Sequence, residues 1–141
     1  MDQFYISVYN FDLMLSIDAY HYFGDTAEML QSLIPFVKKG GHIAVAIPGL
    51  KYEFGKNVPD EMQPFWNSEM ERTLRSLDWW KALWAKAQGI EIVDSREMSC
   101  CRQAWEEWLT AYHPIVAEDI KMMEAEGGKY FNFIQLIAKV I

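Results

Sequence analysis

An acidic residue, a tyrosine and a histidine follow a short apolar run near the start of the sequence. The run is Phe11–Ile17, and Asp18, Tyr20 and His21 come soon after it. Histidine titrates near neutral pH, so His21 could take a proton from an oxygen or nitrogen atom during a reaction. A tyrosine ring can stabilise a cation placed over its face. The structural alternatives are that Asp18 caps a turn or helix and that His21 packs and forms hydrogen bonds in a loop.

Two pairs of residues could belong to a metal site. Asp18 and His21 are separated by two residues, and Cys100 and Cys101 are adjacent. Neither pair has a third ligand nearby in the sequence at the spacing of known metal sites, so we expect no metal. Adjacent cysteines rarely form a disulfide, because the small ring conflicts with the preferred backbone geometry. Free thiols favour a reducing compartment, and we therefore expect a cytoplasmic protein.

The composition limits the partners that these residues could have. The chain has 141 residues, 51% of them hydrophobic and 23% charged, which predicts a single domain over residues 1–141. A net charge of −7 repels a phosphate backbone and argues against nucleic acid as a partner. No apolar stretch approaches the ~18 residues that a membrane span needs, so we expect no membrane partner.

The elements that must position these residues alternate between strands and helices. Alternating and continuous apolar patterns predict strands over Phe11–Ile17, His42–Ile47, Ile90–Ser95 and Tyr130–Ile141. Between the first two strands, Asp25 and Glu28 predict a capping box that opens a helix. Pro35 predicts a kink in that helix or two short helices, and Gly40-Gly41 predicts its end.

Further helices are predicted between the later strands. Ser68 and Glu71 predict a second capping box, opening a helix that continues to Gly89, and two more helices are predicted before Gly127-Gly128. The polar segment Lys51–Gln63 is expected to be a loop or lid. Helical spacing favours packing over an aromatic cage for a group of four tryptophans, namely Trp66, Trp79, Trp80 and Trp84. The late helices carry acidic residues that we expect on a solvated face, namely Glu106, Glu107, Glu118, Asp119, Glu124 and Glu126.

Two segments contain motifs that bear on the family, FDLMLSIDAYHYF at 11–23 and KKGGHIAVAIPG at 38–49. In this order, and with a terminal pair of strands, they resemble the second half of a class I S-adenosylmethionine-dependent methyltransferase. In that family an FD-hydrophobic strand is the fourth of the sheet, and a K/R-P-G-G turn introduces the fifth. Lys39 stands where the family usually has proline. The resemblance covers about residues 10–141.

The resemblance implies a partial Rossmann-like α/β sheet with the family's strands in the order four, five, seven, six. Helices would cover both faces, and the last strand would be antiparallel. The family's glycine-rich loop, E/D-x-G-x-G-x-G, wraps the methionyl part of the cofactor, but no two glycines of this sequence are separated by a single residue. We therefore expect a methyltransferase lacking its first three strands and inactive alone, as an engineered truncation, a gene fragment or a degenerate relative.

The same resemblance implies roles for residues around the end of the first predicted strand. Ser16, Ile17 and Asp18 would lie beside S-adenosylmethionine, the expected cofactor. Tyr20 and His21 would be the catalytic residues, on the side of the methyl acceptor. The acidic charge of the chain leaves a small molecule as the expected acceptor.

A second interpretation is a non-catalytic binding or assembly module. Without the family's first three strands, Phe11–Ile17 would present an exposed apolar edge, and such an edge can pair with another chain. Phe4–Tyr9 could fold back onto this edge; otherwise we expect a homo-oligomer or association with a missing N-terminal half. A third interpretation, another nucleotide-binding α/β fold, is disfavoured because the sequence has no phosphate-cradling loop.

Overall fold

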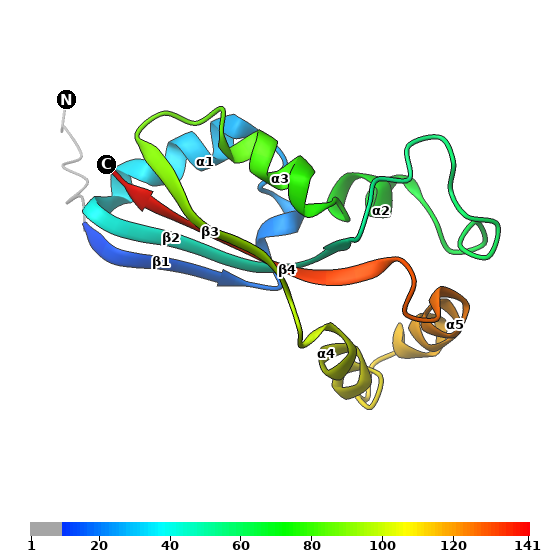
Figure 1. The fold of residues 1–141 in the computed structure, drawn as a ribbon. Helices are drawn as coiled ribbons and strands as arrows, with labels where there is room; N and C mark the ends of the chain where they lie inside the picture. Colours follow the sequence, from blue (N-terminus) through cyan, green and yellow to red (C-terminus); the bar gives the residue numbers. More distant parts are fainter. Residues whose placement is uncertain (1–9) are drawn as a thin grey trace, which may run out of the picture.

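A computed structural model describes residues 10–141 and shows one mixed sheet of four strands. The strands β1 (Phe11–Ile17), β2 (Val37–Leu50), β3 (Ile90–Met98) and β4 (Phe131–Val140) lie in the order β1-β2-β4-β3 (Figure 1). β1 is parallel to β2, whereas β4 is antiparallel to both β2 and β3. The predicted strand order and the antiparallel last strand are confirmed. The segment Phe4–Tyr9, which could fold back onto the edge of β1, lies outside the described residues.

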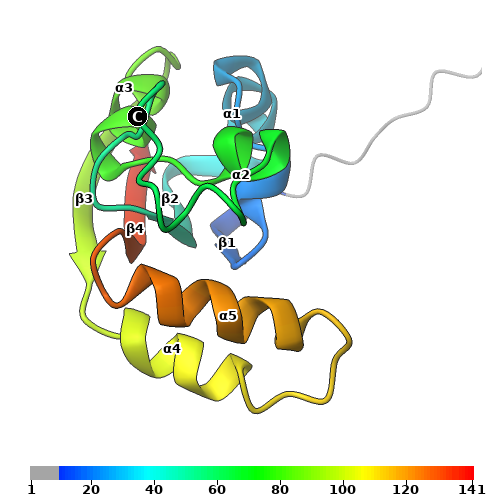
Figure 2. The same cartoon turned by 90° about the vertical axis from the view of Figure 1, so that its right-hand side faces the viewer.

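Helices lie on both sides of this sheet but cover its faces unequally. α1 (Ala27–Leu33) and α3 (Leu77–Trp84) pack along one face (Figure 1). α4 (Cys101–Trp108) and α5 (Val116–Glu126) lie on the other side, near the carboxyl ends of β1 and β2 (Figure 2). The short helix α2 (Ser68–Thr73) lies across that end of the sheet from them. None of the helices in residues 10–141 is long and apolar enough to cross a lipid bilayer.

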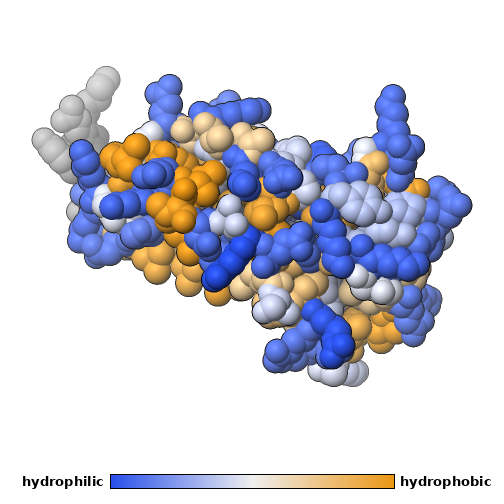
Figure 3. Space-filling model, viewed as in Figure 1, coloured by the Kyte–Doolittle hydropathy of each residue, from blue (hydrophilic) through white to orange (hydrophobic). Residues whose placement is uncertain are grey.

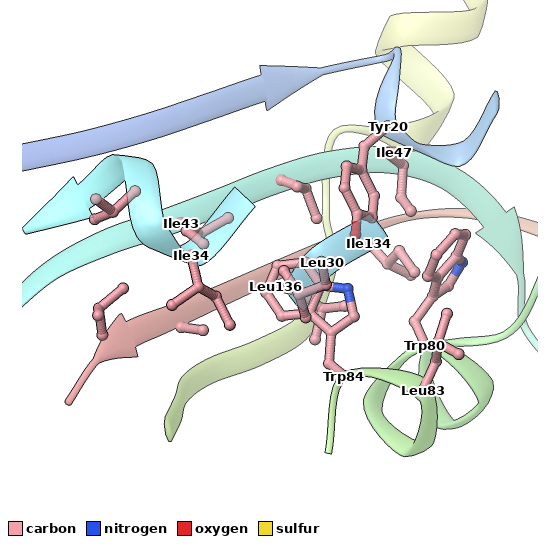
Figure 4. Packing of buried hydrophobic residues seen from close by; sticks show 14 residues of the cluster. Tyr20, Leu30, Ile34, Ile43, Ile47, Trp80, Leu83, Trp84, Ile134 and Leu136 are labelled. Carbon is pink, nitrogen blue, oxygen red and sulfur yellow. The ribbon is translucent and has the colours of Figure 1, made fainter. Parts of the chain in front are cut away.

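The main hydrophobic core lies between the sheet and α1 and α3. Every second residue of β2 and β4 points into it, and the helices contribute Leu30, Trp80 and Trp84, all fully buried (Figure 4). The tryptophans expected to pack therefore do so, with Trp66 and Trp79 partly buried at the margins of two core clusters. The strand residues of the main core include Ile43, Val45, Ile47, Ile134 and Leu136.

The helical segment between β1 and β2 is broken where the sequence predicts it but ends earlier. α1 stops at Leu33, and Pro35 lies in the first turn of a 3-10 helix, Ile34–Phe36, where its missing N–H costs nothing. β2 begins immediately afterwards at Val37. The prediction that Gly40-Gly41 ends the helix is therefore wrong.

The two glycines instead form an irregularity in the ladder between β1 and β2. The register jumps there, because Phe11 pairs with Val37 but Leu13 pairs with His42. Gly40 has a φ of 86°, which disfavours side chains. A Cβ on Gly41 would lie 2.8 Å from the carbonyl oxygen of Asp12, so the strands approach too closely there for any larger residue.

Two helix starts differ from the predicted capping boxes by one residue. The side chain of Thr26, not Asp25, accepts a hydrogen bond from the Met29 amide at the start of α1 (3.2 Å). Likewise Asn67, not Ser68, caps α2. Both predictions were wrong because an adjacent residue also had a capping side chain.

The long helix predicted from Ser68 to Gly89 is two helices. The chain is extended between α2 and α3, where the Leu50 amide donates to the Arg75 carbonyl (3.1 Å). Ser76 then caps α3 by accepting from the Trp79 amide (3.2 Å). The break separates α2 from the main core, and α2 lies beside the carboxyl end of β1 (Figure 2) with Met70 packed against a second hydrophobic cluster.

A buried carboxylate fixes the return from α5 to β4. Glu126 is fully buried and accepts hydrogen bonds from three backbone amides, those of Gly128 (2.6 Å), Tyr130 (2.6 Å) and Phe131 (2.8 Å). The expectation that this residue lies on a solvated face is therefore wrong. Gly127 ends α5 in the left-handed conformation, with a φ of 59°.

Within residues 10–141, no element covers the face of the sheet opposite α1 and α3 over β1 and β2. We call it the open face; its members are Leu13, Leu15, Ile17, Ala44 and Ala46. The three β1 side chains are 52%, 59% and 65% exposed. Figure 3 shows hydrophobic atoms along the edge of the molecule where β1 runs in Figure 1. β1 is also an edge strand of the described sheet, so none of residues 10–141 pairs with its outer edge.

Candidate functional site

A cleft of about 760 Å³ lies at the end of the sheet where β1 and β2 stop. The turn after β1 contributes Asp18, His21 and Tyr22, and the strands β2 and β4 contribute Pro48 and Phe133. Ligands of open α/β sheets bind at this end, and the volume is typical of small-molecule sites. α2 forms one wall and α4 and α5 form the other (Figure 2). The wall residues include Phe65, Asn67, Glu69, Met70, Thr73, Leu74, Trp105, Trp108, His113, Ile115, Glu118, Asp119 and Met122.

Asp18 makes the turn that leads the chain from β1 into the cleft. Its φ of 53° is the only positive value of a residue other than glycine in residues 10–141. Aspartate tolerates this conformation better than most residues do. The Asp18 amide donates to the Ala46 carbonyl of β2 (2.8 Å), which fixes the turn. Partial burial raises the pKa of the Asp18 carboxyl above its ordinary value.

His21 is buried beside the cleft without a hydrogen-bond partner for one ring nitrogen. Its side chain lines the cleft, only 2% of the residue is exposed, and its Nδ1 has no partner in the described chain. Burial lowers the pKa of His21 to about 4, so the imidazole is neutral at pH 7. The ring packs on Tyr22, with 4.0 Å between their centroids. A neutral imidazole in this position is able to accept a proton or a hydrogen bond.

Tyr20 points the other way, into the main core (Figure 4). Its ring lies 5.9 Å, centroid to centroid, from each of Trp80 and Trp84. Burial raises the pKa of its hydroxyl to about 12. Tyr20 does not line the cleft, whereas Tyr22 does. Its position therefore argues against the substrate-side role expected from the sequence, and Tyr22 is the aromatic residue available for that role.

The three residues expected beside the cofactor lie in different environments. Ser16 is half-buried and lies on the same side of β1 as Met14, which packs against the main core. Ile17 belongs to the open face. Of the three, only Asp18 has a side chain in the cleft, so Ser16 and Ile17 could contribute there only through their backbone.

Acidic side chains from three elements converge on the cleft. Glu69 of α2 and Glu118 and Asp119 of α5 line it together with Asp18. Burial raises the pKa of Tyr22, and the negative charges of Asp18, Glu69 and Asp119 raise it further. No lysine or arginine is among the residues of the described chain that line the cleft. The cleft therefore carries a negative potential.

The sequence did not reveal the walls of this cleft. It placed Glu118 and Asp119 on a solvated face and assigned no role to His113, yet all three line the cleft. The Trp108 indole nitrogen donates to Asp119 (2.7 Å), which ties α4 to α5. The only available signal was the apolar spacing of Trp105 and Trp108, which indicated a helix but not what the helix faces.

The described residues form no cluster of three or more metal-ligand side chains. In residues 10–141 no three His, Cys, Asp or Glu side chains lie close enough together to hold a metal ion. Cys100 and Cys101 are half-buried and not joined in a disulfide. Burial raises the pKa of Cys101 to about 11, which makes its thiol a poor nucleophile at neutral pH.

The fold is similar to those of solved methyltransferases. Over 93% of its length, the chain matches a protein from Galdieria sulphuraria assigned as a sarcosine dimethylglycine methyltransferase, with a TM-score of 0.68 at 14% identity. It matches geranyl diphosphate C-methyltransferase from Streptomyces coelicolor with a TM-score of 0.64, and phosphoethanolamine N-methyltransferase 2 from Haemonchus contortus with 0.60, over 92% of this chain at 12% and 15% identity. The structures of the last two contain S-adenosylhomocysteine.

The matches cover only part of each solved chain, namely 53%, 47% and 33% of the three in that order. No protein-family model matches the sequence, and no curated protein matches it either. At these identities the similarity concerns the fold. The described chain has the fold of the C-terminal half of a class I methyltransferase domain, as its sequence motifs led us to expect.

Proposed function

We propose that this chain is the C-terminal half of an S-adenosylmethionine-dependent methyltransferase that acts on a small molecule. The observation that carries the proposal is the position of the cleft, which opens at the carboxyl ends of β1 and β2 in a sheet of the methyltransferase order. The cleft volume of about 760 Å³ suits a small acceptor rather than a polymer. The solved structures with this fold support methyl transfer as the reaction class.

The residues of the cleft fit one end of S-adenosylmethionine. Asp18 offers a carboxylate to the positively charged part of the molecule, and the strained turn at this residue brings the backbone of β1 to the edge of the cleft. The exposed ring of Tyr22 offers an aromatic face to a cation. The sequence contains no GxG, so we propose that a complementary polypeptide segment completes the nucleotide site and that these residues alone are inactive.

When bound, S-adenosylmethionine supplies an electrophilic methyl group to a nucleophilic atom of the acceptor. The residues of this chain orient the acceptor and exclude water, with Pro48 and Phe133 at the floor of the cleft and Trp105 in its wall. His21, neutral at pH 7, accepts a hydrogen bond from the acceptor and orients it, and the proton that the acceptor loses passes to solvent, because an imidazole with a pKa of about 4 is a weak base. His21 is thus the proposed catalytic residue, with Asp18 on the cofactor side.

Calorimetric titration with S-adenosylhomocysteine tests this proposal. We expect weak, saturable binding, because the cleft holds only one end of the ligand, and a thermal stabilisation that grows with the ratio of ligand concentration to Kd. Asp18→Asn should weaken this binding, whereas Asp12→Asn, which removes an exposed carboxylate at the opposite end of β1, should not. An absence of heat and of thermal stabilisation at millimolar ligand would contradict the proposal for this chain.

A second candidate function is assembly without catalysis. It is favoured by the open face and free edge of β1, where Leu13, Leu15 and Ile17 are more than half exposed in an otherwise well-packed sheet. Such a surface binds a second copy of this chain or a complementary segment. We propose that the chain forms a homo-oligomer through this surface.

We also propose a cytoplasmic location, because the free thiols of Cys100 and Cys101 agree with a reducing compartment.

A further inference from the structure

We infer that the cleft selects an acceptor that carries a positively charged amine, in preference to a neutral or phosphorylated one. This inference rests on the proposed function, because the bound amine is a methyl acceptor only if the site carries out methyl transfer. Binding of the amine itself is a property of this chain that can be measured separately.

The first argument is the balance of charges that line the cleft. Four carboxylates face it, from Asp18, Glu69, Glu118 and Asp119. Lys121 pairs with Glu118 (2.9 Å), so that one is partly neutralised within α5. Asp119 accepts a hydrogen bond from the Trp108 indole nitrogen, a neutral donor that does not offset a negative charge.

Glu69 and Asp18 make no ion pair in the described chain that would offset their charges. The nearest basic residue on α2, Arg72, is instead occupied outside the cleft. Its guanidinium pairs with Asp25 (3.2 Å) and donates to the Tyr22 carbonyl (3.1 Å). Two carboxylates therefore remain for the cation of an acceptor, those of Glu69 and Asp119, beside Asp18 on the cofactor side.

The second argument is independent of the carboxylates. His21 lines the same cleft and is only 2% exposed. Its Nδ1 has no hydrogen-bond partner in the described chain. Buried polar groups without a partner are uncommon in folded proteins and often mark a functional site. An amine N–H is a donor that a neutral imidazole is able to bind.

The third argument is the aromatic lining between these polar groups. Tyr22, Trp105, Trp108 and Phe133 line the cleft, and aromatic faces attract alkylammonium groups. A phosphate group would meet the same carboxylates without any lysine or arginine of the described chain in the lining. The combination of carboxylates and aromatic rings is chemically complementary to an ammonium group on an apolar body.

Three probes that share a phenylethyl body test the charge preference on the whole chain. 2-Phenylethylamine is protonated at pH 7, 2-phenylethanol is neutral, and 2-phenylethyl phosphate is anionic. Titrations followed by NMR chemical shifts should show that the amine binds at least about fivefold tighter than the alcohol, and the phosphate weakest. The amine affinity should fall with added salt. Equal binding of amine and alcohol, or tighter binding of the phosphate, would overturn the inference.

Two isosteric variants on the same helix locate the effect. Glu69→Gln should weaken amine binding about threefold, and the double variant with Asp119→Asn about tenfold, because exposed charge pairs contribute modestly. Glu71→Gln removes the same charge from α2 but does not line the cleft, and should leave the affinity unchanged. Equal effects of Glu69→Gln and Glu71→Gln would show that only the net charge matters and would contradict the inference.

The same samples separate this inference from the proposed function. Each variant is also titrated with S-adenosylhomocysteine, whose binding Glu69→Gln should leave intact. Binding of S-adenosylhomocysteine without an amine preference overturns the inference and leaves the proposed function standing. An amine preference without S-adenosylhomocysteine binding overturns the proposed function, and the acceptor role with it, and leaves an amine-binding site.

Discussion

At the scale of single residues, burial separates the roles of neighbours in the turn after β1. Tyr20 and His21 are consecutive and both 2% exposed, yet one completes the core and the other lines the cleft. Asp18 holds the turn between them and β1 in a left-handed conformation. The functional groups of the cleft therefore depend on a backbone that turns sharply within four residues.

The buried imidazole of His21 should make stability depend on pH. Burial lowers its pKa to about 4 in the folded state, against about 6.5 in an unfolded chain. Below about pH 6.5 the unfolded chain binds a proton that the folded chain does not, so stability is complete above this pH and is lost as the pH falls toward 4. We expect a loss on the order of 2 kcal/mol from this group.

The measurement is urea unfolding at several pH values between 7 and 4. His21→Gln removes the titrating group, so the free energy of unfolding of this variant should fall less steeply over the same range. Parallel curves for the two proteins would show that the His21 pKa is not lowered in the fold.

Glu126 should be among the most sensitive residues for stability. Glu126→Ala leaves two buried backbone amides and one part-buried amide without an acceptor, and we expect a loss of about 3 kcal/mol or more. Glu124→Ala, on an exposed position of the same helix, should cost about 0.5 kcal/mol or less. Chemical denaturation measures both, and similar costs for the two variants would exclude the buried hydrogen bonds as a main support of this connection.

At the scale of elements, the patterns that the sequence shows best are those set by neighbours along the chain. The alternation in β2 and β4 and the break at Pro35 could be predicted, because strand period and the missing proline N–H are local properties. The start of β2 could not, because Gly40-Gly41 is a common helix end and only pairing with β1 makes it part of a strand. The same holds for the break before Ser76, which depends on a contact with Leu50.

Gly24 should be required where the turn after β1 leads into α1. A Cβ at this position would lie 2.1 Å from the Tyr20 ring, so Gly24→Ala must displace the ring from the core, at a cost of about 2–3 kcal/mol. Gly40→Ala, which meets no atom within 4 Å but has a φ of 86°, should cost only about 1 kcal/mol. Thermal or urea unfolding compares them; equal losses would mean that the ring does not constrain the turn.

At the scale of the whole molecule, the helices cover one face of the sheet and leave the other partly open. The cleft and the open face meet at the end of β1, since Ile17 belongs to the open face and Asp18 to the cleft. A segment that covered the open face would therefore also border the cleft. The sequence predicted the exposed edge from the family's strand order, but not the cleft walls, because these depend on contacts between α2, α4 and α5 that no local pattern encodes.

The open face should drive association in solution. We expect light scattering at micromolar concentration to give a mass above that of one chain. Leu15→Lys places a charge in the open face and should shift the protein toward the mass of a monomer. Val93→Lys, at a similarly exposed position on the opposite edge strand β3, should leave the mass unchanged. A monomeric mass for the unaltered chain would contradict the assembly proposal.

The most direct test of the proposed methyltransferase site is an NMR titration of the ¹⁵N-labelled chain with S-adenosylhomocysteine, which detects even weak binding and locates it. We predict saturable shifts of backbone amides centred on Asp18, His21 and Tyr22, extending to the residues around Pro48 and Glu69. Shifts confined to the open face, or none at millimolar ligand, would contradict the assignment of this cleft to methyl transfer.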